Sequence, residues 1–309
     1  MPRHDGIIVI GPPRSGTTLL RRLIDAHPNI ACPSETNLLT ACARFLHRES
    51  FAEGLEIGVL SGLGYVGFPE GEVLERLRAF ALSFPREYAA RAGKARWADK
   101  SAFDAFHLDT IEALLGGHAY FVCVERHGLD VVCSLAEFCE RSGGYVGELF
   151  DYIRRTPSPL EAFAHAWVDL TRRIAGFAER HRDSALLVKY EELATDPEAV
   201  LRRVFEFVEE PWHPGLVDTA LASREQIGLG DWKTYARPTI DATSVGRYRT
   251  LSRAARSRLG QIVNPTLVAR GYDAVDVDPP PSRDEARRRY ELGMRLQSAR
   301  DGEGGKHRA

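Results

Sequence analysis

A glycine-rich segment near the start of the sequence has the residue types and spacing of a loop that binds phosphate or sulfate. Four residues separate Gly11 from Gly16 in the string GPPRSGTT. In such a loop, backbone amides and the start of the following helix surround a cluster of anionic oxygen atoms. Arg14 lies inside the loop, and Thr17 stands where a nucleoside triphosphatase has the lysine that contacts the β- and γ-phosphates. The charge of Arg14 therefore suits a single phosphate or sulfate group.

A second segment places an arginine and a hydroxyl where they can bind one phosphate together. Arg126 follows the apolar run 120–124 closely, and Ser134 lies eight residues further on, in a stretch with helical periodicity. The planar fork of an arginine and a nearby hydroxyl suit such an anion well. The alternative is a surface arginine followed by Asp130 as a helix cap.

Together the two segments resemble the sulfotransferases that use 3′-phosphoadenosine 5′-phosphosulfate (PAPS) and release adenosine 3′,5′-bisphosphate (PAP). The string PRSGTT matches the family's loop for the 5′-phosphosulfate. This resemblance assigns five residues to that group: Arg14, Ser15, Gly16, Thr17 and Thr18. The second segment is similar to the family's 3′-phosphate motif, which implies that Arg126 and Ser134 bind the 3′-phosphate. His127 and Gly128 replace the family's usual Asp or Asn and Pro, so the turn after Arg126 departs from the family's pattern.

Two further segments resemble the family less closely. Tyr190, in VKYEEL, is similar to the strand-end tyrosine that lies near the adenine, although it could equally be a packed ring. The string SVGRYR at 244–249 resembles the family's Gly-x-Trp loop over the 3′-phosphate, without the preceding Arg-Lys-Gly of the cytosolic branch. We take Arg247 as the basic residue of this loop and Lys233 as the alternative.

Sulfuryl transfer also needs groups that stabilise charge and a base that removes the acceptor's proton. Glu35 lies where the tyrosylprotein branch of the family has its catalytic glutamate, which implies that Glu35 is the general base. The alternative is an acidic residue at a helix start capped by Ser34. Lys100, in WADKS, resembles the family's Asp-Lys-Thr-Pro segment and would stabilise the transition state together with Arg14. His107 is the alternative base, because the cytosolic branch uses a histidine.

Short apolar runs that alternate with helical patterns predict the elements that position these residues. The expected strands are 7–10, 120–124 and 185–188. This alternation is typical of an α/β fold, a three-layer parallel sheet whose strand-end loops share one edge. Residues 38–95 are predicted to form a helical insertion on the acceptor side, with one helix at Gly71–Leu82.

The sequence predicts one sulfotransferase domain at residues 1–275 and an appendage at residues 276–309. The appendage begins with a break containing three successive prolines. A polar helix is expected at Asp284–Arg300, followed by a disordered end from Asp301.

Composition and charge exclude several classes of protein. The chain has 309 residues, of which 44% are hydrophobic and 27% charged, as in ordinary globular proteins. A net charge of -2 disfavours nucleic-acid binding. The absence of an apolar run of about 18 residues or of a signal-peptide pattern predicts a cytoplasmic protein without membrane contact. Five cysteines without CxxC spacing predict neither a disulfide framework nor a metal site.

Two other functions compete with the sulfotransferase interpretation. A phosphate-loop nucleotide kinase or triphosphatase is disfavoured by Thr17 and by the lack of a clear magnesium-binding aspartate at a strand end. A non-catalytic nucleotide-binding domain could use the C-terminal helix for interaction. The sequence leaves open the identity of the acceptor and whether the chain forms a homo-oligomer.

Overall fold

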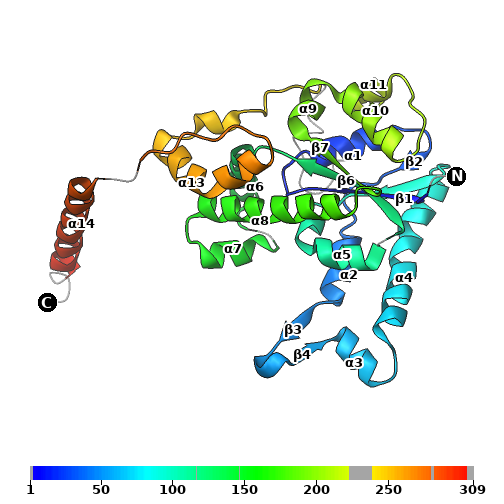
Figure 1. Cartoon of the computed structure of the whole chain (residues 1–309), viewed down its shortest axis with the longest axis horizontal. Coiled ribbons are helices and arrows are strands. Elements are labelled where there is room, and N and C mark those ends of the chain that lie inside the picture. The colour runs from blue at the N-terminus through cyan, green and yellow to red at the C-terminus, as the bar shows by residue number, and fades with distance from the viewer. Residues whose placement is uncertain (1–2, 116, 146, 223–238, 280–281, 305–309) are drawn as a thin grey trace.

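A five-stranded parallel sheet forms the centre of the molecule, in the order β2-β5-β1-β6-β7 (Figure 1). The computed structural model describes residues 3–115, 117–145, 147–222, 239–279 and 282–304. The strands are β1 (Gly6–Ile10), β2 (Ile30–Ala31), β5 (Arg96–Asp99), β6 (Ala119–Glu125) and β7 (Ala185–Lys189). The predicted α/β fold with a parallel sheet is therefore confirmed. Strands β2 and β5 were not predicted.

Helices cover both faces of this sheet. Ile7 and Val9 of β1 pack against one helical layer, whereas Ile8 and Ile10 pack against the other. The first layer contains α1 (Thr17–Asp25), α9 (Tyr190–Thr195), α10 (Pro197–Phe207) and α11 (Leu216–Ala222). The second contains α5 (Leu108–Leu115) and α8 (Pro159–Arg180). A strand buried on both faces needs a continuous apolar run, which is why β1 was recognisable from its sequence.

A third group of helices packs beside the end of β6. The group consists of α6 (Gly128–Ser142), α7 (Leu149–Arg155), the first half of α8, and α13 (Arg253–Ala269). A short 3-10 helix, η3 (Arg247–Thr250), lies against α6. This packing brings a segment from late in the sequence to the end of a central strand.

The insertion between β2 and β5 is only partly helical, so the prediction of a helical segment was wrong in part. It contains α2 (Leu38–Phe45), β3 (Arg48–Ser50), η1 (Ala52–Gly54), β4 (Glu56–Gly58), α3 (Val59–Tyr65) and α4 (Glu70–Arg91). Strands β3 and β4 pair antiparallel, and their connection contains Glu53 and Gly54 with φ of 69° and 77°. Glycine favours such a left-handed turn. The hairpin and α3 project from the body of the molecule (Figure 1).

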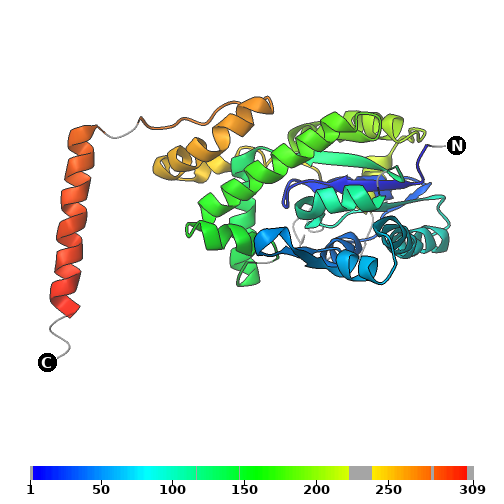
Figure 2. The same cartoon turned by 60° about the horizontal axis from the view of Figure 1, so that its bottom comes forward.

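The C-terminal helix α14 (Arg283–Gly304) lies apart from the rest of the molecule (Figures 1 and 2). Its exposed surface carries ion pairs at helical spacing, between Arg287 and Glu291 and between Arg289 and Glu285, each at 3.0 Å. Such pairs stabilise a helix that buries little apolar surface. The prediction of a disordered end from Asp301 is wrong for residues 301–304, and residues 305–309 lie outside the described part. The domain boundary at 275/276 stays a prediction.

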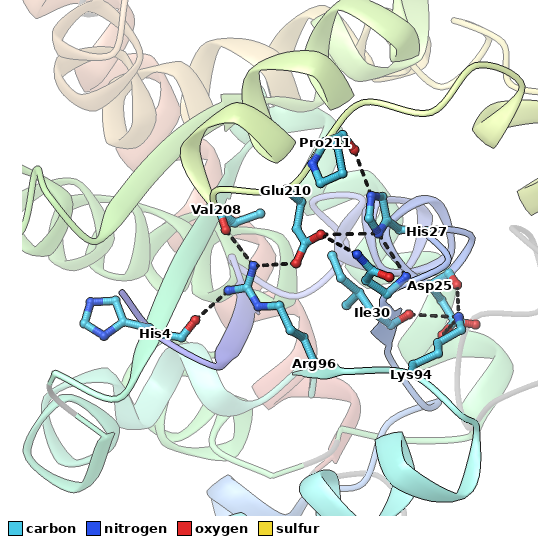
Figure 3. Close-up of polar contacts among 10 residues, drawn as sticks. His4, Asp25, His27, Ile30, Lys94, Arg96, Val208, Glu210 and Pro211 are labelled. Carbon is cyan, nitrogen blue, oxygen red and sulfur yellow. Dashed lines mark hydrogen bonds and ion pairs between the residues drawn. The ribbon is translucent and has the colours of Figure 1, made fainter. Parts of the chain in front are cut away.

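A buried ionic network fixes the segment after α10 to the edge of the sheet (Figure 3). Arg96 donates hydrogen bonds to the carbonyl oxygen of Val208 (2.6 Å) and to the Glu210 carboxylate (3.0 Å). The ring of His27, just after α1, bonds to the carbonyl oxygen of Pro211 at 2.9 Å. Arg96 is the first residue of β5, so this network lies at the opposite end of that strand from Lys100.

Candidate active site

The glycine-rich loop joins β1 to α1 in a conformation that its residues make possible. Gly16 has a φ of 95°, and a Cβ atom there would lie 2.2 Å from the ring of Tyr190, so both the backbone and the space require glycine. Arg14 also has a positive φ, 71°. Thr17 begins α1, and the next residue, Thr18, is buried with it. The hydroxyl of Ser15 is buried and has no hydrogen-bond partner among the described residues.

The structure brings together two predicted phosphate-binding segments that are far apart in the sequence. Arg14 Nε donates to Ser134 Oγ at 3.3 Å, and Arg126 Nη1 donates to the carbonyl oxygen of Arg14 at 2.9 Å. The Arg126 guanidinium also lies 4.2 Å from the centre of the Tyr190 ring. Because β1 and β6 are neighbouring parallel strands, their carboxyl ends meet at one edge of the sheet.

Arg126 is held in place by its surroundings. Its side chain is 5% exposed, so the alternative of a surface arginine is wrong. Burial lowers the pKa of Arg126, and the nearby Tyr190 and Asp130 act in the opposite direction. Trp167 Nε1 donates to the backbone carbonyl of Arg126 at 3.1 Å, which fixes the end of the strand. A buried guanidinium that remains charged is well suited to an anionic ligand.

Asp130 holds the C-terminal segment 244–249 over this edge of the sheet. Its carboxylate accepts hydrogen bonds from the backbone N–H groups of Gly246 (2.7 Å) and Tyr248 (2.9 Å). Arg126 Nη2 donates to the carbonyl oxygen of Ser244 at 2.6 Å. The His127 ring stacks on Tyr248, with ring centres 4.5 Å apart. The unusual His-Gly turn after Arg126 is therefore packed against the segment that it helps to position.

These segments surround a cavity of about 80 Å³. The predicted residues that line it are Arg14, Gly16, Arg126, Ser134, Tyr190 and Arg247. Its volume is far below the roughly 300 Å³ at which small-molecule sites begin, so it suits one phosphate or sulfate group. Arg247 also pairs with Glu137 at 2.7 Å. Lys233, the alternative to Arg247, lies outside the described residues.

The sequence analysis missed several residues at this cavity. They include Arg22 and Thr239. Arg22 follows Thr18 by one helical turn on α1, so helical spacing was a signal that could have identified it. Thr239 reaches the cavity through long-range packing, which no local pattern indicates.

The second pair of predicted functional residues is joined by an ion pair. The Lys100 ammonium contacts the Glu35 carboxylate, and the Lys100 side chain is 1% exposed. Glu35 lies in the loop after β2, and Lys100 directly follows β5, the neighbour of β2. The capping alternative for Glu35 is wrong, because α2 begins at Leu38 and the Leu38 N–H bonds to the hydroxyl of Thr36 instead of Ser34.

Two buried carboxyl groups accompany Lys100. The Thr36 hydroxyl donates to Asp99 at 2.9 Å, and the Thr40 hydroxyl donates to Asp104 at 2.7 Å. Burial raises the pKa of Asp99 to about 6. Burial and the charge of Asp99 raise the pKa of Asp104 to about 8. Asp104 is therefore mostly protonated at neutral pH. As a result, the three carboxyl groups near the Lys100 ammonium, those of Glu35, Asp99 and Asp104, do not all carry a full negative charge.

The alternative base, His107, is paired elsewhere. Its Nε2 lies 2.6 Å from the Glu148 carboxylate, to which Arg44 also donates at 2.9 Å. Burial raises the pKa of Glu148, but hydrogen bonds from His107 and Arg44 outweigh it and lower the pKa to about 2. The structure thus pairs Lys100 with Glu35 and His107 with Glu148.

The described part of the chain has neither a metal-binding group of side chains nor a helix that could span a membrane. There, no three His, Cys, Asp or Glu side chains are grouped so that they could hold a metal ion. None of the helices in those residues has both the length and the apolar character needed to span a bilayer.

The fold and the site define an α/β protein with an arginine-lined cavity at the carboxyl edge of a parallel sheet. Residues 6–214 match the model of the sulfotransferase family, and the chain belongs to that family. It is 28% identical over 260 residues to nodulation protein NoeE of Sinorhizobium fredii, covering 78% of this chain and 59% of that protein. It is also 28% identical over 223 residues to protein-tyrosine sulfotransferase A of Caenorhabditis elegans, covering 72% of this chain and 53% of that one. The chain therefore spans little more than half of these relatives.

Solved structures show the same fold. The sulfotransferase domain from the curacin biosynthetic pathway superimposes with a TM-score of 0.59 at 20% identity, covering 89% of this chain and 99% of that domain. The sulfotransferase domain of the Synechococcus PCC 7002 olefin synthase gives a TM-score of 0.57 at 22% identity, covering 88% and 96%. At these identities the likeness supports the architecture alone.

Proposed function

We propose that this chain transfers a sulfuryl group from PAPS to a hydroxyl or amine acceptor. The observation that carries the proposal is the junction of the two phosphate-binding segments. Arg126 donates to the backbone of Arg14, and Arg14 donates to Ser134, around one anion-sized cavity. Membership in the sulfotransferase family supports the same conclusion.

Donor binding divides between the two ends of the nucleotide. Ser15, Thr17, Thr18 and the loop amides would hold the 5′-phosphosulfate, and the orphaned Ser15 hydroxyl fits this role. Arg126 and Ser134 would hold the 3′-phosphate, with Arg247 over it, and Tyr190 would lie near the adenine. PAPS supplies the activated sulfuryl group.

The reaction needs one proton transfer and the stabilisation of charge on oxygen. Glu35 would accept the proton of the acceptor hydroxyl as the acceptor oxygen bonds to sulfur. Lys100 and Arg14 would stabilise the negative charge that remains on the departing phosphate oxygen as its bond to sulfur breaks. The contact between Glu35 and Lys100 supports this assignment because the proposed base and the proposed cation lie side by side.

Calorimetric titration with PAP and with ATP plus magnesium tests the donor assignment. We expect micromolar PAP binding, much weaker ATP binding, and a loss of about 2 kcal/mol in PAP binding for Arg126→Ala. Arg155→Ala, which changes an exposed arginine of α7, is the matched control and should bind PAP normally. Tight ATP binding without a preference for the 3′-phosphate would instead support the kinase alternative.

A further inference from the structure

A second and larger cavity lies beside helix α4, on the insertion side of the sheet. Its volume is about 510 Å³, within the roughly 300–1,000 Å³ of small-molecule sites. Four aromatic side chains line it: Phe80, Phe84, Tyr88 and Trp97. The first three are spaced by four residues, so they share one face of α4.

The α4 aromatics in this cavity are unusually accessible for large apolar side chains. Phe80, Phe84 and Tyr88 are 54%, 53% and 42% exposed. The Phe80 and Phe84 rings meet edge to face, with centres 5.2 Å apart. These rings contribute little to the core and present their surfaces to the cavity, where a ligand could cover them.

One end of the cavity adjoins the segments that carry the Glu35–Lys100 ion pair. Thr36 and Asp99 line this end and are hydrogen-bonded to each other at 2.9 Å. Thr36 directly follows Glu35, and Asp99 directly precedes Lys100. A molecule whose body fills the cavity would therefore have one end close to the proposed base.

The lining indicates what such a molecule is made of. Besides the aromatic rings, it consists largely of leucine, proline and alanine side chains. The charged residues Glu87 and Arg91 are paired with each other and well exposed. A sugar or a charged peptide would lose hydration in this cavity without gaining enough hydrogen-bond partners. A planar hydrocarbon ring would gain from burial and from edge or face contacts with the aromatic rings.

We propose that this cavity binds the apolar body of the acceptor, and that the acceptor is a small phenol or ring alcohol. This inference rests on the proposed function and narrows its acceptor class. The hydroxyl lies at the Thr36–Asp99 end, and the ring system lies along the aromatic face of α4.

The test measures binding of 2-naphthol to the PAP-loaded protein by calorimetry, beside a tyrosine-containing peptide and a disaccharide. The double variant Phe80→Ala/Phe84→Ala changes exposed residues and should weaken 2-naphthol binding at least tenfold. Ala81→Phe should fill the cavity and weaken it similarly, with thermal melting as a check of folding. Phe150→Ala, on α7, removes an equally exposed ring elsewhere and should change nothing.

The outcomes separate this inference from the proposed function. Absence of 2-naphthol binding, equal binding to the wild type and the double variant, or a preference for the peptide or disaccharide would overturn the acceptor assignment. Normal PAP binding in the same experiments would leave the sulfotransferase proposal intact. Failure of the wild type to bind PAP would overturn the sulfotransferase proposal itself. Even in that case, 2-naphthol binding to the wild type that is lost in Phe80→Ala/Phe84→Ala would establish the cavity as a binding site.

Discussion

Replacing Glu35 by glutamine should separate its role as a base from its role as the partner of Lys100. Glutamine keeps the size of the side chain and an oxygen that can accept from the ammonium, but it cannot take up the acceptor's proton. Loss of a general base lowers kcat by roughly 10²- to 10⁴-fold, about 2.7–5.5 kcal/mol in the barrier.

Glu35→Gln should lower the free energy of unfolding by less than it raises the barrier of the reaction. Removing one partner of a buried ion pair costs roughly 3–5 kcal/mol, because it leaves the other charge uncompensated. Lys100 is 1% exposed, but Glu35 is 15% exposed, and the glutamine oxygen can still accept a hydrogen bond. We therefore expect a loss of about 2 kcal/mol in the free energy of unfolding, below that range.

The assay is the initial rate of PAP release with the acceptor that gives the highest wild-type rate, alongside calorimetric PAP binding. Glu198→Gln is the matched control, since Glu198 also belongs to an ion pair, with Arg202, but lies on the exposed surface of α10. Glu35 is not the base if Glu35→Gln keeps more than a tenth of kcat with the wild-type pH profile while His107→Gln loses activity. That result would make His107 the base.

Three further predictions follow from the buried groups and the loop. The pKa of Asp104 is raised from 3.8 to about 8 in the folded protein, so stability is lost as pH rises from about 4 through 8. Asp104→Asn should match the wild-type melting temperature at pH 4 and exceed it at pH 9. The same difference in melting temperature between variant and wild type at both pH values would contradict this. Arg96→Met should lower the free energy of unfolding by roughly 3–5 kcal/mol in urea titrations, because the buried Glu210 carboxylate loses its arginine partner. Adding Glu210→Leu should recover most of that loss, and no recovery would argue against an electrostatic cause. Gly16→Ala should weaken PAP binding at least tenfold by calorimetry, because the new Cβ atom collides with the Tyr190 ring; unchanged affinity would show that the loop is free to adjust.

Local sequence was sufficient for the parts of the fold that depend on neighbouring residues. The runs at 7–10 and 120–124 are buried on both faces of the sheet, and the run at 185–188, in the edge strand β7, is buried or half-buried. All three runs are therefore apolar throughout, which makes them visible as strands. The glycine loop was equally clear, because its conformation needs particular residues at particular positions. The carboxyl ends of parallel strands lie along the same edge of a sheet. The sequence therefore also indicated that the two phosphate-binding segments, which follow two such strands, would lie close together.

Strands β2 and β5 show what the local pattern could not reveal. Strand β2 has two residues, and β5 begins with Arg96 and ends with Asp99, so neither has an apolar run of useful length. Their pairing is set by contacts between residues far apart in the chain. Likewise, the β3–β4 hairpin depends on a turn within a segment whose composition had suggested helix.

The sequence determined which chemical groups this protein has, and tertiary structure decided which of them act together. Arg14, Arg126 and Lys100 could be singled out by motif alone. The contact between Lys100 and Glu35, which are 65 positions apart, exists only because β2 and β5 are neighbours in the sheet. The raised pKa of Asp104 arises in the same way, because removal of water around a carboxyl group is a property of the packed structure and cannot be assigned to a residue type.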